Sequence, residues 1–128
     1  MATPDLLDVL VVGAGPAGVA AACTARSRGL TVSVLDRARF PRDKTCGDGL
    51  TAGALRLLER LGVEVPGIPS TTRIDTVVLA GPDGRRVTLP LPGDGLRSVV
   101  TRRRDLDDAM VRHARARGVE IGEERLVT

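Results

Sequence analysis

Residues 8–18 read Asp-Val-Leu-Val-Val-Gly-Ala-Gly-Pro-Ala-Gly, and this stretch decides the fold. Its apolar run at 9–12 predicts a parallel strand buried on both faces. The G-x-G-x-x-G pattern that follows a strand predicts a tight turn into a helix. A helix of small residues is expected over 16–28, and a second strand over 31–35. The stretch therefore predicts a βαβ unit that binds a dinucleotide.

The residue types of this fingerprint each have a mechanical reason. Gly13 allows the turn, Gly15 lets the backbone approach a pyrophosphate, and Gly18 lets the helix lie close to the sheet. Pro16 suits the first turn of a helix, where its missing N–H would have no partner. The helix start offers N–H groups and a positive dipole end to phosphates. Asp36 lies 18 residues after Gly18, and its carboxylate is expected to accept hydrogen bonds from a ribose diol.

Composition limits the function further. The 128 residues are 42% hydrophobic with one aromatic residue, and the formal net charge is +3. Few aromatics and a basic run at 102–104 interleaved with acids argue against nucleic-acid binding. Cys23 and Cys46 have neither metal-site nor C-x-x-C spacing, which favours a reduced, cytoplasmic protein. The lack of positive charge in residues 1–5 and the glycines of the fingerprint argue against a leader or a transmembrane segment.

The rest of the chain alternates helices and strands. An amphipathic helix is expected over 50–61, with Leu57 and Leu58 among its inward residues. Two strands around the turn Gly81-Pro-Asp-Gly84 predict an antiparallel hairpin, which does not belong to a simple βαβ wind. The remaining expected elements are a short strand at 99–100, a helix capped by Asp105 and running to 117, and a strand at 119–121. His113, the one histidine, is expected to have no catalytic role.

The segment 37–49 has no periodicity and contains four cations, Arg37, Arg39, Arg42 and Lys44. Two interpretations of it are equally supported by the residues alone. It is either a solvated surface loop or a lid in which Arg42 or Lys44 meets the phosphates of a cofactor.

Three stretches resemble the FAD-binding part of flavoprotein oxidoreductases of the para-hydroxybenzoate hydroxylase fold, closest to the geranylgeranyl reductase-like family. They are the fingerprint at 8–18 with Asp36, the segment Phe40-Pro-Arg-Asp-Lys-Thr-Cys-Gly-Asp-Gly-Leu50, and Arg103-Arg-Asp-Leu-Asp107. The resemblance implies an α/β fold, namely a Rossmann-like FAD-binding βαβ domain over 1–128 that is incomplete. It also implies that the hairpin at 73–92 would begin the sheet of a substrate domain.

The resemblance also implies roles for single residues. Cys46 and Gly47 would lie beside the flavin, and Arg103 would contact the cofactor. Relatives more often have Glu at position 36, so the reach of Asp36 to the ribose is one carbon shorter. The residues expected to bind FAD are Gly13, Gly15, Pro16, Ala17, Gly18, Asp36, Arg37, Arg42, Cys46, Gly47 and Arg103.

The resulting hypothesis is the N-terminal part of a flavin-dependent oxidoreductase, either a prenyl double-bond reductase or an aromatic hydroxylase. NAD(P)H is the expected electron donor, and the substrate is a small molecule or a prenyl lipid, which leaves peripheral contact with a membrane open. We expect this segment alone to be inactive, because the later flavin motif of the family is not in it. The alternatives are an NAD-dependent dehydrogenase module, which Asp36 would suit, and a truncated nucleotide-binding module without catalysis.

Overall fold

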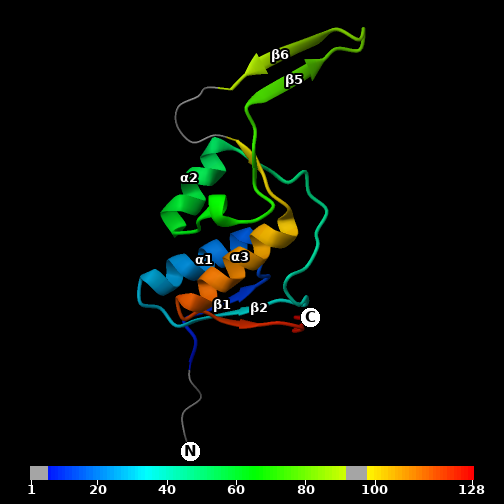
Figure 1. The fold of residues 1–128 in the computed structure, drawn as a ribbon. Helices are drawn as coiled ribbons and strands as arrows, with labels where there is room; N and C mark the ends of the chain where they lie inside the picture. Colours follow the sequence, from blue (N-terminus) through cyan, green and yellow to red (C-terminus); the bar gives the residue numbers. More distant parts are fainter. Residues whose placement is uncertain (1–5, 92–97) are drawn as a thin grey trace, which may run out of the picture. The chain divides into compact units, whose positions relative to one another are not determined.

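The computed structural model describes residues 6–91 and 98–128 (Figure 1), which form two compact units. The first unit combines Met1–Thr45 with Arg103–Thr128, and the second is Cys46–Arg102. Residue 92 of the expected hairpin segment and the start of the chain at 1–5 lie outside the described residues.

The first unit is a parallel sheet with two helices. Its strands are β1 (Val9–Val12), β2 (Val32–Leu35) and β8 (Glu120–Gly122), in the order β1-β2-β8. β1 pairs with β2 from Val9↔Val32 to Val12↔Leu35, and β2 pairs with β8 from Ser33↔Glu120 to Leu35↔Gly122. The predicted βαβ unit is therefore present, and the strand expected at 119–121 forms one residue later.

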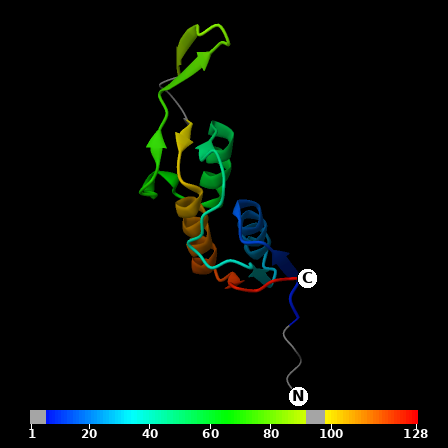
Figure 2. The same ribbon diagram turned by 90° about the vertical axis from the view of Figure 1, so that its right-hand side faces the viewer.

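Helices α1 (Pro16–Ser27) and α3 (Arg103–Ala116) lie side by side over one face of this sheet (Figures 1 and 2). α3 buries Leu106 and Met110 almost completely, as its periodicity predicts, but begins two residues before Asp105. Asp105 thus lies in the first turn instead of capping the helix. There the negative charge still complements the helix dipole.

Strand β1 is buried on one face only, so the prediction that both faces are covered is wrong for the part of the chain that the structure describes. Leu10 and Val12 are 53% and 63% exposed, while the alternate residues Val9 and Val11 are half-buried. The reason is that α1 and α3 lie on the same face of the sheet.

The fingerprint glycines behave as their spacing predicts. Gly13 has a φ of +101°, in the left-handed region that favours glycine, and its N–H donates to the carbonyl of Leu35 at 2.7 Å. A Cβ at Gly18 would overlap the carbonyl oxygen of Gly13. The turn therefore requires Gly13 for its backbone angle, and the helix can approach the strand because position 18 has no side chain.

The second unit contains the remaining elements. They are β3 (Gly49–Leu50), α2 (Ala52–Leu61), the 3₁₀ turn η1 (Val65–Gly67), β4 (Thr72–Arg73), β5 (Thr76–Ala80), β6 (Arg86–Pro90) and β7 (Val99–Val100). β7 pairs antiparallel with β3 and with β4, while β5 and β6 form the antiparallel hairpin expected from the turn at 81–84. The assignment of this hairpin to a substrate sheet stays a prediction.

Helix α2 confirms the predicted element but corrects its inward face. Thr51 caps it by accepting the N–H of Ala54 at 3.3 Å, and Gly62 ends it with a φ of +86°. Leu55 and Leu58 are buried, whereas Leu57 is 60% exposed. With several leucines in the helix, the sequence allowed two faces, and only the packing against η1 and β3 selects between them.

Asp8 provides a pH-dependent contribution to stability at the start of β1. Its carboxylate accepts the N–H of Thr31 and the Thr31 hydroxyl, each at 2.7 Å, and these hydrogen bonds lower the pKa of Asp8. A lowered folded-state pKa stabilises the protein above the unfolded pKa of about 3.9, and the contribution is lost as pH falls through the folded-state pKa. We expect Asp8→Asn to melt below the wild type at pH 7, with the gap closing in acid. Melting curves of both proteins at several pH values would test this, and a gap independent of pH would contradict it.

Candidate dinucleotide cleft

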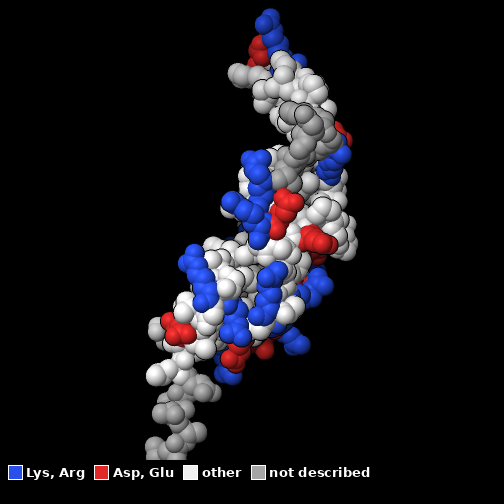
Figure 3. Space-filling model, turned by 90° about the vertical axis from the view of Figure 1, so that its left-hand side faces the viewer, with Lys and Arg blue, Asp and Glu red and all other residues white. Residues whose placement is uncertain are grey.

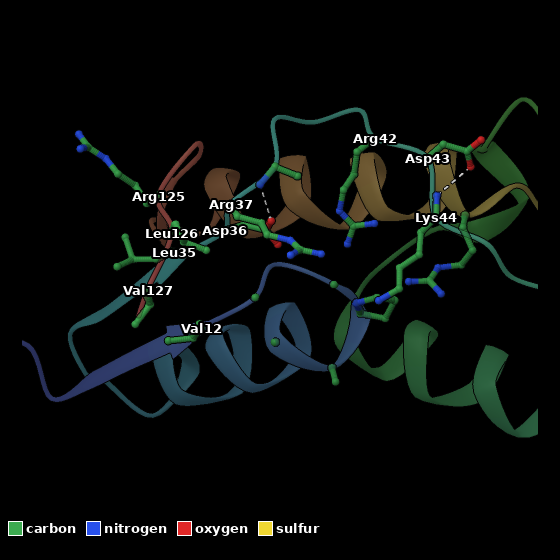
Figure 4. Close-up of a pocket in the computed structure, with 17 residues that line it drawn as sticks. Val12, Leu35, Asp36, Arg37, Arg42, Asp43, Lys44, Arg125, Leu126 and Val127 are labelled. Atoms are coloured by element: carbon green, nitrogen blue, oxygen red, sulfur yellow. Dashed lines mark hydrogen bonds between the residues drawn. The ribbon is translucent and has the colours of Figure 1, made fainter.

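A cleft of about 830 Å³ opens at the carboxyl ends of β1 and β2, within the first unit (Figure 4). This is the size of a pocket for a ligand of drug-like to cofactor dimensions. The carboxyl edge of a parallel sheet is also where ligands bind in open α/β folds. The residues lining the cleft are Val12, Gly13, Gly15, Pro16, Ala17, Gly18, Leu35, Asp36, Arg37, Ala38, Arg42, Asp43, Lys44, Arg103, Arg125, Leu126 and Val127.

Asp36 holds the glycine turn from the end of β2. Its Oδ2 accepts the N–H of Ala14 at 2.7 Å, and its Oδ1 accepts the N–H of Ala38 at 2.8 Å. The residue is only 8% exposed, yet it lines the cleft. Each carboxylate oxygen has a further lone pair, so two backbone donors leave the group able to accept from a ligand hydroxyl. The carboxylate therefore fixes the fingerprint loop, a role the sequence did not reveal.

One end of the cleft is cationic. Arg42, from the segment after β2, and Arg103, from the first turn of α3, both line it together with Lys44. We call these three residues the cationic end. The guanidinium of Arg42 lies over the ring of Phe40, 4.9 Å from the centroid, which is a cation–π arrangement. Arg42 also lies at Gly15, because its Nη2 would be 3.7 Å from a Cβ at that position.

The opposite end of the cleft is mainly apolar, although Arg125 also lies there in Figure 4. Val12, Leu35, Leu126 and Val127 gather there from β1, β2 and the segment after β8, with Asp36 and Arg37 between them and Arg42 in Figure 4. We call these four residues the apolar end. Exposed apolar side chains that converge on one cavity are typical of a ligand site. The cleft thus runs from an apolar end, past a carboxylate, to the cationic end above the start of α1.

The lining of the cleft is net positive. Its lining contains the cations Arg37, Arg42, Lys44, Arg103 and Arg125 and the acids Asp36 and Asp43. On the face shown in Figure 3, basic and acidic side chains are interspersed. Local positive charge beside a helix N-terminus favours an anionic ligand.

The structure brings together most of the residues predicted to bind a cofactor. Those lining the cleft are Gly13, Gly15, Pro16, Ala17, Gly18, Asp36, Arg37, Arg42 and Arg103. Cys46 and Gly47 are exposed residues of the second unit and are not among the lining residues. Their place beside a flavin stays a prediction. Cys23 is buried in α1, and that burial raises the pKa of its thiol, as expected for a packing residue.

Sequence reasoning missed the contribution of the segment after β8. Arg125, Leu126 and Val127 line the cleft because β8 lies beside β2 and ends at the same edge of the sheet. The strand expected at 119–121 carried this signal, since residues that follow parallel strands meet at their carboxyl edge. The role of Asp107 was also missed, since the residue was quoted only as part of the stretch Arg103–Asp107 and no contact was expected of it.

Comparison with known proteins agrees with this geometry. The model of a family described as an FAD binding domain matches residues 6–128. The chain belongs to this FAD binding domain family. Its α/β fold is the Rossmann-like fold expected, and the resemblance to flavoprotein oxidoreductases is confirmed.

Two proteins of known name have sequences similar to this chain. The chain is 46% identical over 103 residues to a menaquinone reductase of Mycolicibacterium smegmatis, which covers 79% of the chain and 25% of the relative. It is 37% identical over 118 residues to digeranylgeranylglycerophospholipid reductase 2 of Methanopyrus kandleri, covering 91% and 27%. The chain thus spans about a quarter of the length of these two relatives.

A flavoprotein/dehydrogenase from Cytophaga hutchinsonii superposes on the chain with a TM-score of 0.82 at 24% identity, covering 95% of the chain and 31% of that protein. At this identity the match shows the fold alone. Within the described residues, none of the helices is long and apolar enough to cross a membrane.

Proposed function

We propose that the cleft of the first unit binds the ADP half of FAD. The observation that carries the proposal is the order of groups along the cleft. An adenine would lie at the apolar end, its ribose at Asp36, and the diphosphate between the start of α1 and the cationic end. The order apolar, carboxylate, cation matches the order adenine, sugar, diphosphate.

The residues present fit this group on physical grounds. The only atom near a Cβ at Gly15 would be Arg42 Nη2, in ordinary contact, so the space above the glycine backbone is open to a ligand among the residues described. The first N–H groups of α1 have no partner within the helix, because a helix start always leaves them unpaired. The buried Nη1 of Arg42 lies 3.2 Å from Asp107 Oδ2, which leaves Nη2, the atom beside Gly15, to donate into the cleft. Diphosphate oxygens suit such donors.

We further propose that the protein is part of an FAD-dependent oxidoreductase that reduces a prenyl double bond. Bound FAD would supply hydride chemistry, and the protein would orient it. The names of two relatives, a menaquinone reductase and a digeranylgeranylglycerophospholipid reductase, support reduction over aromatic hydroxylation. NAD(P)H as donor, a small-molecule or prenyl-lipid substrate and a cytoplasmic location belong to the same proposal.

Binding of FAD is the direct test. We expect FAD and ADP to raise the melting temperature of the purified protein, while FMN, which lacks the ADP half, does not. A ligand at 100 times its Kd stabilises the folded state by about 2.7 kcal/mol. Flavin fluorescence gives a second readout.

The outcomes separate the alternatives. Stabilisation by NAD but not by FAD would favour a dehydrogenase module and overturn the proposal. A cooperative melt that no nucleotide shifts would favour a module without this function. If FAD binds, anaerobic bleaching by NADH or NADPH tests the proposed donor.

A further inference from the structure

One buried carboxylate joins two arginines of the cleft. Asp107 lies on α3 with its side chain 0% exposed. Its Oδ1 accepts Arg103 Nε at 2.9 Å, and its Oδ2 accepts Arg103 Nη2 at 3.1 Å, which is a bidentate pair. Oδ2 is also 3.2 Å from Nη1 of Arg42. Both arginines line the cleft, whereas Asp107 does not.

These contacts hold Arg42 from two sides. Asp107 faces Nη1, and Cζ of Arg42 lies over the Phe40 ring. The remaining terminal nitrogen, Nη2, is the one beside Gly15. A flexible arginine loses rotamer entropy when it is fixed, so a side chain that is already fixed before binding lowers the entropic cost of binding the ligand.

We propose that Asp107 is a positioning residue for the dinucleotide. It holds the side chains of Arg42 and Arg103 in the orientation in which they bind the diphosphate. The inference rests on the proposed FAD site and adds a residue that never touches the ligand. It also assigns a function to the contact between Arg42, in the segment after β2, and Asp107 on helix α3. Asp107 lies in the first turns of α3, one turn after Arg103, so the helix serves as the rigid support of both side chains.

The charge of Asp107 and its positioning role predict opposite changes in ligand affinity when the carboxylate is removed. Asp107 is negative, so its removal makes the cleft more positive and, through Coulomb attraction alone, would tighten binding of an anion. If its role is to hold the arginines, its removal weakens binding in spite of the gained positive charge. The sign of the change therefore decides between the two effects.

The test compares Asp107→Asn with Asp108→Asn in the purified protein. Asp108 is the matched control, because it forms an i,i+4 pair with Arg112 at 2.9 Å on the same helix but lines no part of the cleft. Isothermal titration with ADP and NMR titration with adenosine measure how much the diphosphate adds to binding. We expect Asp107→Asn to weaken ADP binding about 10-fold or more, to leave adenosine binding unchanged, and thus to lower the ADP-to-adenosine affinity ratio. Asp108→Asn is expected to stay within about two-fold for both ligands.

A loss of folding would lower the affinity for both ligands and leave their ratio intact, so the ratio separates positioning from stability. Phe40→Leu provides a second variant without any change of charge, and we expect it to lower the same ratio several-fold by releasing Arg42. Unchanged or tighter ADP binding by Asp107→Asn, or an unchanged ratio in both variants, would overturn the inference while the FAD site stands. Failure of the wild type to bind ADP or FAD would overturn the proposed function together with the inference.

Discussion

Replacing Gly18 by alanine is expected to destabilise the protein by about 3 kcal/mol or more, at the upper end of overpacking costs. The added Cβ would overlap the carbonyl oxygen of Gly13, and it would also lie 3.0 Å from the Gly13 carbonyl carbon and 3.2 Å from Val11 Cγ1. A backbone carbonyl cannot rotate away as a side chain does, so α1 must move off the sheet. We expect the melting temperature to fall by about 10 °C or more.

Gly53→Ala is the matched control for this prediction. Gly53 also lies in the first turn of a helix, α2, but a Cβ there would meet, in the part of the chain that the structure describes, only Thr51 Oγ1 at 3.8 Å. Because alanine favours helix over glycine by up to about 1 kcal/mol, this variant should be as stable as the wild type or slightly more so. Equal melting temperatures for Gly18→Ala and the wild type would show that the helix does not need its close approach.

The sequence predicted the first unit well because its signals are local. The fingerprint, the small-residue helix and the strand ending at Asp36 all appear where expected, since turn glycines and apolar periodicity act over a few residues. The hairpin followed in the same way from its Gly-Pro-Asp-Gly turn. The two-residue strands β3 and β4 were missed, because Gly49–Leu50 and Thr72–Arg73 lack the pair of β-branched residues that predicted the equally short β7.

The parts of the site that were missed depend on packing. Asp107 was quoted within a motif, yet a charged residue in a helix ordinarily points to solvent. Its complete burial follows only from the presence of Arg42, 65 positions earlier in the chain, and Arg103 around it. The exposure of Leu10 and Val12 likewise depends on which face of the sheet the helices cover, and no periodicity of β1 determines that.

In contrast to Gly18→Ala, the variant Gly15→Ala is expected to lose FAD binding while its stability stays almost unchanged. Gly15 has φ −73° and ψ 178°, which any residue adopts, and among the described residues an alanine Cβ would meet only Arg42 Nη2 at 3.7 Å. The weaker N-cap propensity of alanine and its lower unfolded-state entropy nearly offset each other, so stability should change by less than about 1 kcal/mol. The methyl group, however, occupies the space through which the diphosphate would approach the backbone N–H groups.

If that approach is lost, one charge-assisted hydrogen bond or more is lost with it, at about 1.5–3 kcal/mol each. We therefore expect FAD affinity to fall about 10-fold to 150-fold, measured by flavin fluorescence titration beside a thermal melt. Two glycines three residues apart would then act through different physics, since the missing Cβ of Gly18 makes room for the sheet and that of Gly15 makes room for the ligand. Wild-type FAD affinity in Gly15→Ala would contradict the proposed position of the diphosphate, because no ligand that close to the backbone could ignore the methyl group.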